Sequence, residues 1–169
     1  MEALLFGHAV MIWPLWVILL CFPAFLGELH AGRAEEMRAN SLSVTGRWIE
    51  FDEATGKPHI IIRILCQQGE YRGIIERPIQ ILPDDDPKGL CRCCKGALHN
   101  QPIIGMTILW GMKKSGPGEW SGGHVLDPRN GTIYQASLRL QENGNKLLVR
   151  GYVLSPLFGR SEVWERVNP

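Results

Sequence analysis

From Thr45 to its end, the chain repeats short stretches in which apolar and polar residues alternate, separated by residues that favour turns. An apolar side chain at every second position faces one side of a β-strand, so each stretch predicts a strand with one buried face. We expect strands over residues 47–51, 59–66, 71–77, 103–113, 119–126, 132–140, 146–153 and 162–167.

The connections between most of these strands are short and rich in glycine and asparagine. Asn130-Gly131 and Asn143-Gly144 are strong hairpin signals, because both residue types tolerate a positive φ. Short hairpins join antiparallel neighbours, and a closed antiparallel meander leaves no exposed sheet edge. The pattern therefore predicts an all-β fold, an antiparallel up-and-down barrel of about eight strands whose interior holds either packed side chains or one small ligand.

Two of the strands predict what lines this interior. In 103–113 the inward positions are Ile104, Met106, Ile108, Trp110 and Met112, and in 132–140 they are Tyr134, Ala136, Leu138 and Leu140. With the strand that follows, the candidate ligand-binding residues are Met106, Ile108, Trp110, Tyr134, Tyr152 and Arg150. The apolar members would either bury a ligand or fill a core. Arg150 could hold a ligand carboxylate with two hydrogen bonds or remain in water.

The first part of the chain has a different character from the rest. Residues 9–26 carry no charged side chain, and Pro14 and Pro23 would kink a membrane-spanning helix. Residues 1–34 therefore predict a signal peptide or N-terminal anchor, 35–45 a linker, and 46–169 the β-barrel domain. We expect a periplasmic or secreted protein that touches the membrane only through its N-terminal segment, if that segment stays uncleaved.

Composition and charge narrow the classes of partner. The chain has 169 residues, of which 45% are hydrophobic and 21% charged, as expected for one globular domain. A formal net charge of +1 removes the usual electrostatic basis for nucleic-acid binding, so we expect no nucleic-acid partner. We expect no cofactor either, because the sequence contains no motif that indicates one.

The longest connection, 78–102, contains a cluster of cysteines. In an oxidising compartment cysteines pair, and the four in the barrel domain allow three connectivities. One of these contains a Cys91–Cys94 bridge and a second bridge between Cys66 and Cys93. A metal site or a redox centre is the alternative, but one Cys-x-x-Cys motif supplies only half of a zinc site. A structural disulfide between Cys91 and Cys94 is the interpretation we favour, with no metal.

His124 and Asp127 are a candidate acid–base pair, for which Ser121 would be the nearest nucleophile. However, Ser121 alternates onto the opposite face from His124. Asp127 precedes Pro128, and an aspartate in that position is typical of a turn. We therefore name no catalytic residue.

A series of short motifs runs in order through residues 46–167. They are Gly46-Arg47-Trp48, the pair Cys91 and Cys94, Pro102-Ile103-Ile104-Gly105, Leu109-Trp110-Gly111, Ser121-Gly122-Gly123, Leu126-Asp127-Pro128 with Gly131 and Tyr134, Val149-Arg150-Gly151-Tyr152, and Phe158-Gly159-Arg160 with Trp164 and Arg166. Through them the chain resembles the bacterial exported proteins grouped as domain of unknown function 2147. The resemblance implies a lipocalin-like (calycin) barrel, periplasmic or otherwise exported, without a settled biochemical activity. Cys93 departs from the family pattern.

The first of these motifs also resembles the lipocalin signature Gly-x-Trp. That resemblance implies that Trp48 plugs one end of the barrel and that a late arginine, here Arg166, packs across its ring. A guanidinium over an indole contributes about 0.5–2 kcal/mol. Ordinary core packing of Trp48, with Arg166 in water, is the alternative.

Three functions from different classes fit these expectations. The leading one is an exported lipocalin-like protein that binds a small apolar ligand in the barrel interior. The second is a structural or interaction protein of the cell envelope, with a filled barrel whose loop 78–102 docks an envelope protein. The third is a hydrolase or isomerase of a hydrophobic small molecule.

Overall fold

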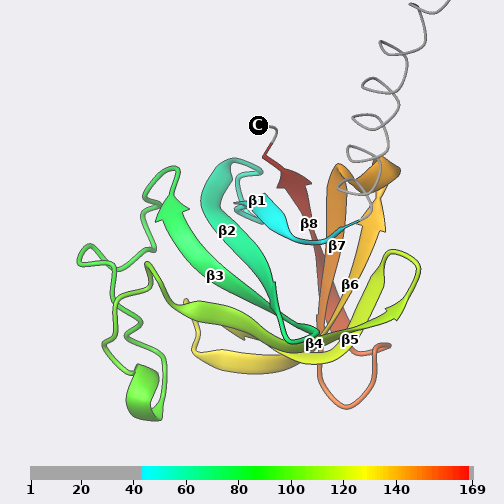
Figure 1. Cartoon of the computed structure of the whole chain (residues 1–169). Helices are drawn as coiled ribbons and strands as arrows, with labels where there is room; N and C mark the ends of the chain where they lie inside the picture. Colours follow the sequence, from blue (N-terminus) through cyan, green and yellow to red (C-terminus); the bar gives the residue numbers. More distant parts are fainter. Residues whose placement is uncertain (1–42, 168–169) are drawn as a thin grey trace, which may run out of the picture. The chain divides into compact units, whose positions relative to one another are not determined.

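The computed structural model describes residues 43–167, in which eight strands form a closed antiparallel barrel (Figure 1). The strands are β1 Gly46–Phe51, β2 Pro58–Gln67, β3 Glu70–Pro78, β4 Thr107–Gly116, β5 Glu119–Asp127, β6 Thr132–Gln141, β7 Lys146–Tyr152 and β8 Gly159–Arg166, with 3₁₀ turns η1 Gly96–Leu98 and η2 Glu142–Gly144. Each strand pairs with the next, and β8 returns to β1. The predicted fold class is confirmed. The predicted signal peptide or anchor at 1–34 lies outside the described residues.

The predicted start of the fourth strand is wrong, because β4 begins only at Thr107. The preceding residues form a turn in which Gly105 has a φ of 84°, a left-handed conformation that favours glycine. The Gly105 amide donates to the carbonyl of Ile75 at 2.8 Å, and the Ile75 amide donates to the carbonyl of Met106 at 3.0 Å. Ile104 therefore lies outside the strand and is 56% exposed instead of facing a core.

One end of the barrel, which we call the closed half, is filled by large side chains. These belong to strand positions near the short turns 68–69, 117–118 and 142–145, and all are at most 2% exposed: Trp48, Ile64, Met112, Trp120, Leu138 and Leu147. The ring of Tyr71 meets that of Trp120 edge to face, with 5.6 Å between centroids. The closed half is therefore an ordinary packed core.

Trp48 is fully buried in this core, and Arg166 covers its ring. The Trp48 indole nitrogen donates to the carbonyl of Val44 at 2.8 Å, and the Arg166 guanidinium carbon lies 4.2 Å from the Trp48 ring centroid. Arg166 also donates to the carbonyls of Ser43, Thr45 and Gly144 at 2.6, 3.0 and 2.6 Å. The guanidinium thus joins the chain entering β1 to the turn before β7.

The glycine two positions before this tryptophan has a steric role. Gly46 has a φ of 128°, and a Cβ atom there would lie 3.0 Å from the Arg166 Nη1 atom. A larger residue would strain the backbone and crowd the guanidinium. The Gly-x-Trp spacing and the late arginine are therefore parts of one packing unit.

The junction between β1 and β8 is the shortest in the barrel. It has two residue pairs, Trp48 with Arg166 and Ile49 with Glu165, fewer than any other strand junction among residues 43–167. We call this junction the seam. It lies in the closed half, so the two strands are not paired where they border the other half.

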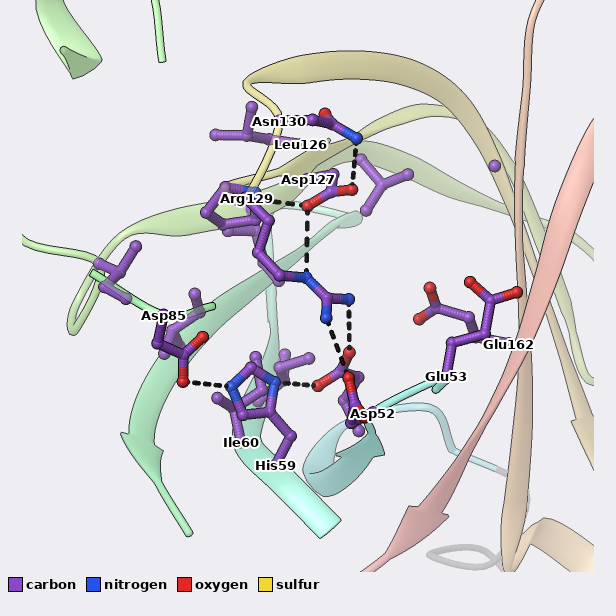
Figure 2. A pocket seen from close by; sticks show the side chains of 18 of the residues that line it. Asp52, Glu53, His59, Ile60, Asp85, Leu126, Asp127, Arg129, Asn130 and Glu162 are labelled. Atoms are coloured by element: carbon purple, nitrogen blue, oxygen red, sulfur yellow. Dashed lines mark hydrogen bonds and ion pairs between the residues drawn. The ribbon is translucent and has the colours of Figure 1, made fainter. Parts of the chain in front are cut away.

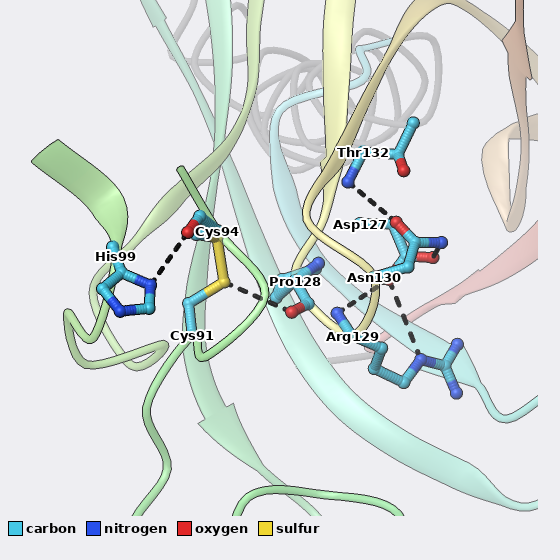
Figure 3. The surroundings of a disulfide bond; sticks show 8 residues. All are labelled: Cys91, Cys94, His99, Asp127, Pro128, Arg129, Asn130 and Thr132. Atoms are coloured by element: carbon cyan, nitrogen blue, oxygen red, sulfur yellow. Dashed lines mark hydrogen bonds and ion pairs between the residues drawn. A yellow bond between two sulfur atoms is a disulfide. The ribbon is translucent and has the colours of Figure 1, made fainter. Parts of the chain in front are cut away.

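The long connection between β3 and β4 is fastened by the Cys91–Cys94 disulfide, which has a Cα–Cα distance of 5.4 Å (Figure 3). Both cysteines are buried, whereas Cys66 and Cys93 are exposed free thiols, so the second bridge is absent from the structure. The Cys91 Sγ atom lies 3.2 Å from the Pro128 carbonyl oxygen. Because a disulfide sulfur has no proton, this is a contact and not a hydrogen bond.

The connection also packs against the β5–β6 turn. A Cβ atom on Gly131 would lie 2.0 Å from the Cys93 carbonyl oxygen, closer than any real contact allows. Only glycine lets the two loops approach this closely. The disulfide-bearing loop and the turn that carries Arg129 therefore form one packed unit at the end of the barrel opposite Trp48.

Candidate functional site

The half of the barrel opposite the plug, which we call the open half, encloses a cavity of ≈ 970 Å³. Its apolar wall is formed by Ile62, Ile75, Ile108, Val125, Val149 and Trp164, which come from six different strands. Its mouth is formed by the connections 52–57, 79–106, 128–131 and 153–158. The volume lies within the range of small-molecule sites in proteins, about 300–1,000 Å³.

The structure brings only two of the six sequence-predicted ligand-binding residues to this cavity. Ile108 and Tyr134 line it, as predicted from alternation. Met106 is 6% exposed and belongs to the surrounding core cluster without lining the cavity. Tyr152 is half-buried at the end of β7, where it pairs with Gly159 of the neighbouring strand β8, and it does not line the cavity.

Arg150 and Trp110 were predicted to contact a ligand inside the barrel, but their side chains lie on the outer face of the sheet. Arg150 donates to the carbonyl of Pro156 and, at 2.8 Å, to the Ser161 hydroxyl, so it fastens the β7–β8 loop. Trp110 is stacked on the exposed His124, with 5.7 Å between centroids and 17° between planes. Neither residue lines the cavity.

A bulge in β4 explains the position of Trp110. The register with β3 shifts between Gly73 and Ile74, opposite residues 107–109, so Ile108 and Leu109 are both buried. A second irregularity follows at Gly111, whose φ is 71°. Each bulge reverses the in-and-out alternation on which the prediction depended.

The polar side of the cavity contains a buried histidine held between two carboxylates (Figure 2). The His59 Nδ1 atom lies 3.1 Å from a Glu50 oxygen, and its Nε2 atom lies 3.0 Å from an Asp85 oxygen. His59 is 7% exposed and Glu50 is 6% exposed. The hydrogen bond to Glu50 raises the pKa of His59 above its ordinary value, against the opposing effect of burial, and Asp85 adds to the rise.

Arg129, from the β5–β6 turn, forms the second polar group of the cavity. Asp127 closes this turn by accepting from the Arg129 amide at 2.9 Å and from the Asn130 side chain at 2.7 Å. The guanidinium then reaches Asp52 at 3.2 Å and Glu50 at 3.8 Å. Hydrogen bonds from Thr55, and to a smaller extent from Arg129, lower the pKa of Asp52.

Glu162 projects from β8 toward the same cavity (Figure 2). Its carboxylate accepts a hydrogen bond from the Trp164 indole nitrogen at 3.3 Å. Burial, and then the nearby charge of Glu50, raise the pKa of Glu162 above its ordinary value. The environment of Glu162 thus opposes its ionisation.

Sequence reasoning missed Glu50, His59, Asp85, Arg129 and Glu162. A signal was present for two of them: Glu50 lies two positions after Trp48 on the inward face of β1, and Glu162 shares a face of β8 with Trp164. The Arg129 contacts depend on the closure of the barrel, which brings together residues 77 positions apart. Alternation alone does not supply that pairing.

The structure does not assemble the acid–base pair considered from the sequence. His124 is exposed against Trp110, whereas Asp127 lines the cavity and holds the β5–β6 turn. Residues 43–167 contain no group of three or more histidine, cysteine or acidic side chains placed to hold a metal ion. No helix within that same range is long and apolar enough to cross a membrane.

Comparison with known proteins gives a family and a fold. The family described as "Uncharacterized protein conserved in bacteria (DUF2147)" matches residues 46–166. Among solved structures, protein HP1028 from the human pathogen Helicobacter pylori, described as belonging to the lipocalin family, is similar with a TM-score of 0.64 and 16% sequence identity. The match covers 75% of this chain and 84% of that one. No curated protein matches.

Proposed function

The chain belongs to the DUF2147 family of uncharacterized bacterial proteins, and we propose that it is an exported protein that binds a small, largely apolar ligand in the cavity. The family description names no activity, so the proposal is argued from the barrel. The observation that carries the proposal is the ≈ 970 Å³ cavity with an aliphatic and aromatic wall. A packed barrel of this size has no such volume to spare. The lipocalin-like fold agrees with ligand binding in general.

The apolar and polar sides of the cavity would make different contributions to ligand binding. Contact with the apolar wall stabilises a ligand by about 25 cal/mol for each Å² removed from water. The polar groups around His59 and Arg129 are held by their own ion pairs, so they can orient a ligand without first being ordered. Affinity would come from the wall, and orientation from the polar side.

Export is part of the proposal and has separate support. The Cys91–Cys94 disulfide is typical of proteins that leave the reducing cytosol. The apolar run in residues 9–26 is the expected signal. A periplasmic or secreted location is tested by fractionating cells and measuring whether the chain in the exported fraction has lost residues 1–34.

Titration with a fluorescent lipophile tests binding directly. The full chain should give saturable fluorescence enhancement at one site, and a Val125→Trp change, which places a larger ring in the cavity wall, should weaken it at least about tenfold. Val163→Trp is the matched control, because Val163 is 41% exposed and does not line the cavity. Absence of saturable binding to the folded chain would end the proposal.

A second candidate function, docking of an envelope protein at the open half, is favoured by the exposed apolar loop between β7 and β8. Leu154 is 90% exposed and Leu157 is 85% exposed. Contiguous exposed apolar side chains often mark interaction sites. The double change Leu154→Ser and Leu157→Ser, at positions that do not line the cavity, should abolish cross-linking to such a partner in cells while the lipophile titration is unaffected.

A further inference from the structure

The lining of the cavity contains more acidic than basic side chains. The acidic ones are Glu50, Asp52, Glu53, Asp84, Asp85, Asp86, Asp127 and Glu162, and the basic ones are His59, Arg129 and Arg160. A ligand that enters the cavity therefore meets an excess of negative charge beside an apolar wall. The sign of that excess restricts which polar head a ligand can carry.

Most of these carboxylates already have a cationic partner. In addition to the His59 and Arg129 pairs described above, Arg160 lies 3.4 Å from Glu53, and Arg92 lies 2.9 Å from Asp86. The two cations on the buried polar side, His59 and Arg129, are thus paired with residues of this chain, whereas the Arg160–Glu53 pair lies in solvent. His59 and Arg129 have little capacity left for a ligand anion.

Glu162 and Asp84 are the two exceptions; Asp84 is exposed on the β3–β4 connection, whereas Glu162 is partly buried. Among residues 43–167 no lysine, arginine or histidine nitrogen lies within 4.0 Å of the Glu162 carboxylate, and its hydrogen bond comes from the neutral Trp164 indole. It projects into the cavity (Figure 2), where burial and the charges of Glu50 and Asp127 oppose its ionisation, while the charge of Arg129 favours it. A cation delivered by a ligand would relieve both the burial of this carboxylate and its repulsion by its neighbours.

We propose that the ligand is an amphipathic amine, with its apolar body against Ile62, Ile75 and Val149 and its ammonium group paired with Glu162. This inference rests on the proposed function and specifies the class of ligand. An ammonium group donates charge-assisted hydrogen bonds to a carboxylate, which are stronger than neutral ones. The apolar wall on the other side excludes water and strengthens the pair.

The same geometry selects against other heads on the same body. A carboxylate head would add a negative charge to the excess already present. A hydroxyl head could accept a hydrogen bond from Glu162 only when that side chain is protonated, or donate one weaker than that of an ammonium group. Among ligands with equal apolar bodies, the order of affinity should therefore be amine, then alcohol, then acid.

Isothermal titration calorimetry with decylamine, decanol and decanoate at pH 7.5 tests this order on the full chain. We expect decylamine to bind at least about tenfold more tightly than decanol, with decanoate weakest. In Glu162→Gln, which keeps the shape of the side chain and removes its charge, the ratio of decylamine to decanol affinity should fall to about one. Glu165→Gln on the same strand is the matched control, because Glu165 is exposed and does not line the cavity, and the ratio should persist there.

A pH series adds a readout that a merely structural role of Glu162 would not produce. Glu162 has a raised pKa, so acidification protonates it before an ordinary glutamate, and the advantage of decylamine should shrink in that window. Equal affinities of decylamine and decanol in the unchanged chain, or preference for decanoate, would overturn the amine inference and leave the proposed function standing. If none of the three probes binds, the proposed function fails with it.

Discussion

The closed and open halves of this barrel are built from the same eight strands, yet one is solid and the other hollow. In the closed half the inward positions carry Trp48, Met112 and Trp120, which fill the space between the strands. In the open half, Val149 and Gly151 continue β7 inward, and Glu50 continues β1. Small and charged residues on the same inward positions leave the cavity, so residue size and charge, more than strand number, decide whether such a barrel is filled.

Removal of the plug is the most damaging way to disturb the closed half. Trp48→Ala should lower the free energy of unfolding by about 3–5 kcal/mol, because it leaves a large void in a packed core and removes the ring under Arg166. Urea unfolding followed by circular dichroism measures this loss. A loss below about 1 kcal/mol would mean that the closed half is not the stable core of the molecule.

A matched pair of changes on β7 compares the halves directly. Leu147 faces the closed half and Val149 the cavity, two residues apart on the same face. Leu147→Ala should cost about 3 kcal/mol, whereas Val149→Ala should cost about 1 kcal/mol, since it enlarges a space that already exists. Equal losses in urea unfolding, after allowance for the size of the side chains removed, would contradict the distinction between the halves.

The disulfide contributes to the mouth of the open half alone. Replacing Cys91 and Cys94 by serine should lower stability by about 2 kcal/mol, the entropic effect expected for so short a loop. Thermal unfolding before and after the change measures it, and Cys66→Ser, which removes an exposed free thiol, should have no effect. If the double change also weakens lipophile binding, the packing of this loop against the Arg129 turn is required for the shape of the mouth.

The smallest effect should appear in the pH dependence of the open half. The pKa of His59 is raised in the folded protein, so its stabilising effect is complete below about pH 6.5 and is lost as the pH rises through the folded value. Between pH 6 and 8.5 the unchanged chain should therefore lose more stability than His59→Gln. Parallel pH profiles from urea unfolding would show that His59 gains no net charge stabilisation from Glu50 and Asp85.

The closed and open halves also differ in how much of their structure could be predicted from the sequence. Strand number and antiparallel order were predictable, because alternation and turn residues are local properties. The packing of Trp48 against Arg166 was expected only from the resemblance to the lipocalin signature. Trp110 was placed inward because the bulges in β4 leave little trace in the pattern of apolar residues. The cavity wall was predicted only at Ile108 and Tyr134, and its charged side was missed.

The charged side was missed for a physical reason. Ion pairs such as Arg129 with Asp52 join residues 77 positions apart, and a sequence gives no distance between them. Charged and histidine side chains are usually exposed, so composition gave no reason to expect His59 and Glu50 to be buried. Their burial is apparent only once the barrel has closed around them.

The seam between β1 and β8, with only two residue pairs among the described residues, has a consequence for local opening of the barrel. Beyond Ile49 the two strands make no further register pairs, and there the Glu50 and Glu162 side chains face the cavity. Native-state hydrogen exchange is expected to show the earliest sub-global opening along this line, while amides around Trp48 exchange only with global unfolding. The weak line is thus confined to the open half, beyond Ile49, and ligand exchange through it would leave Trp48 in place.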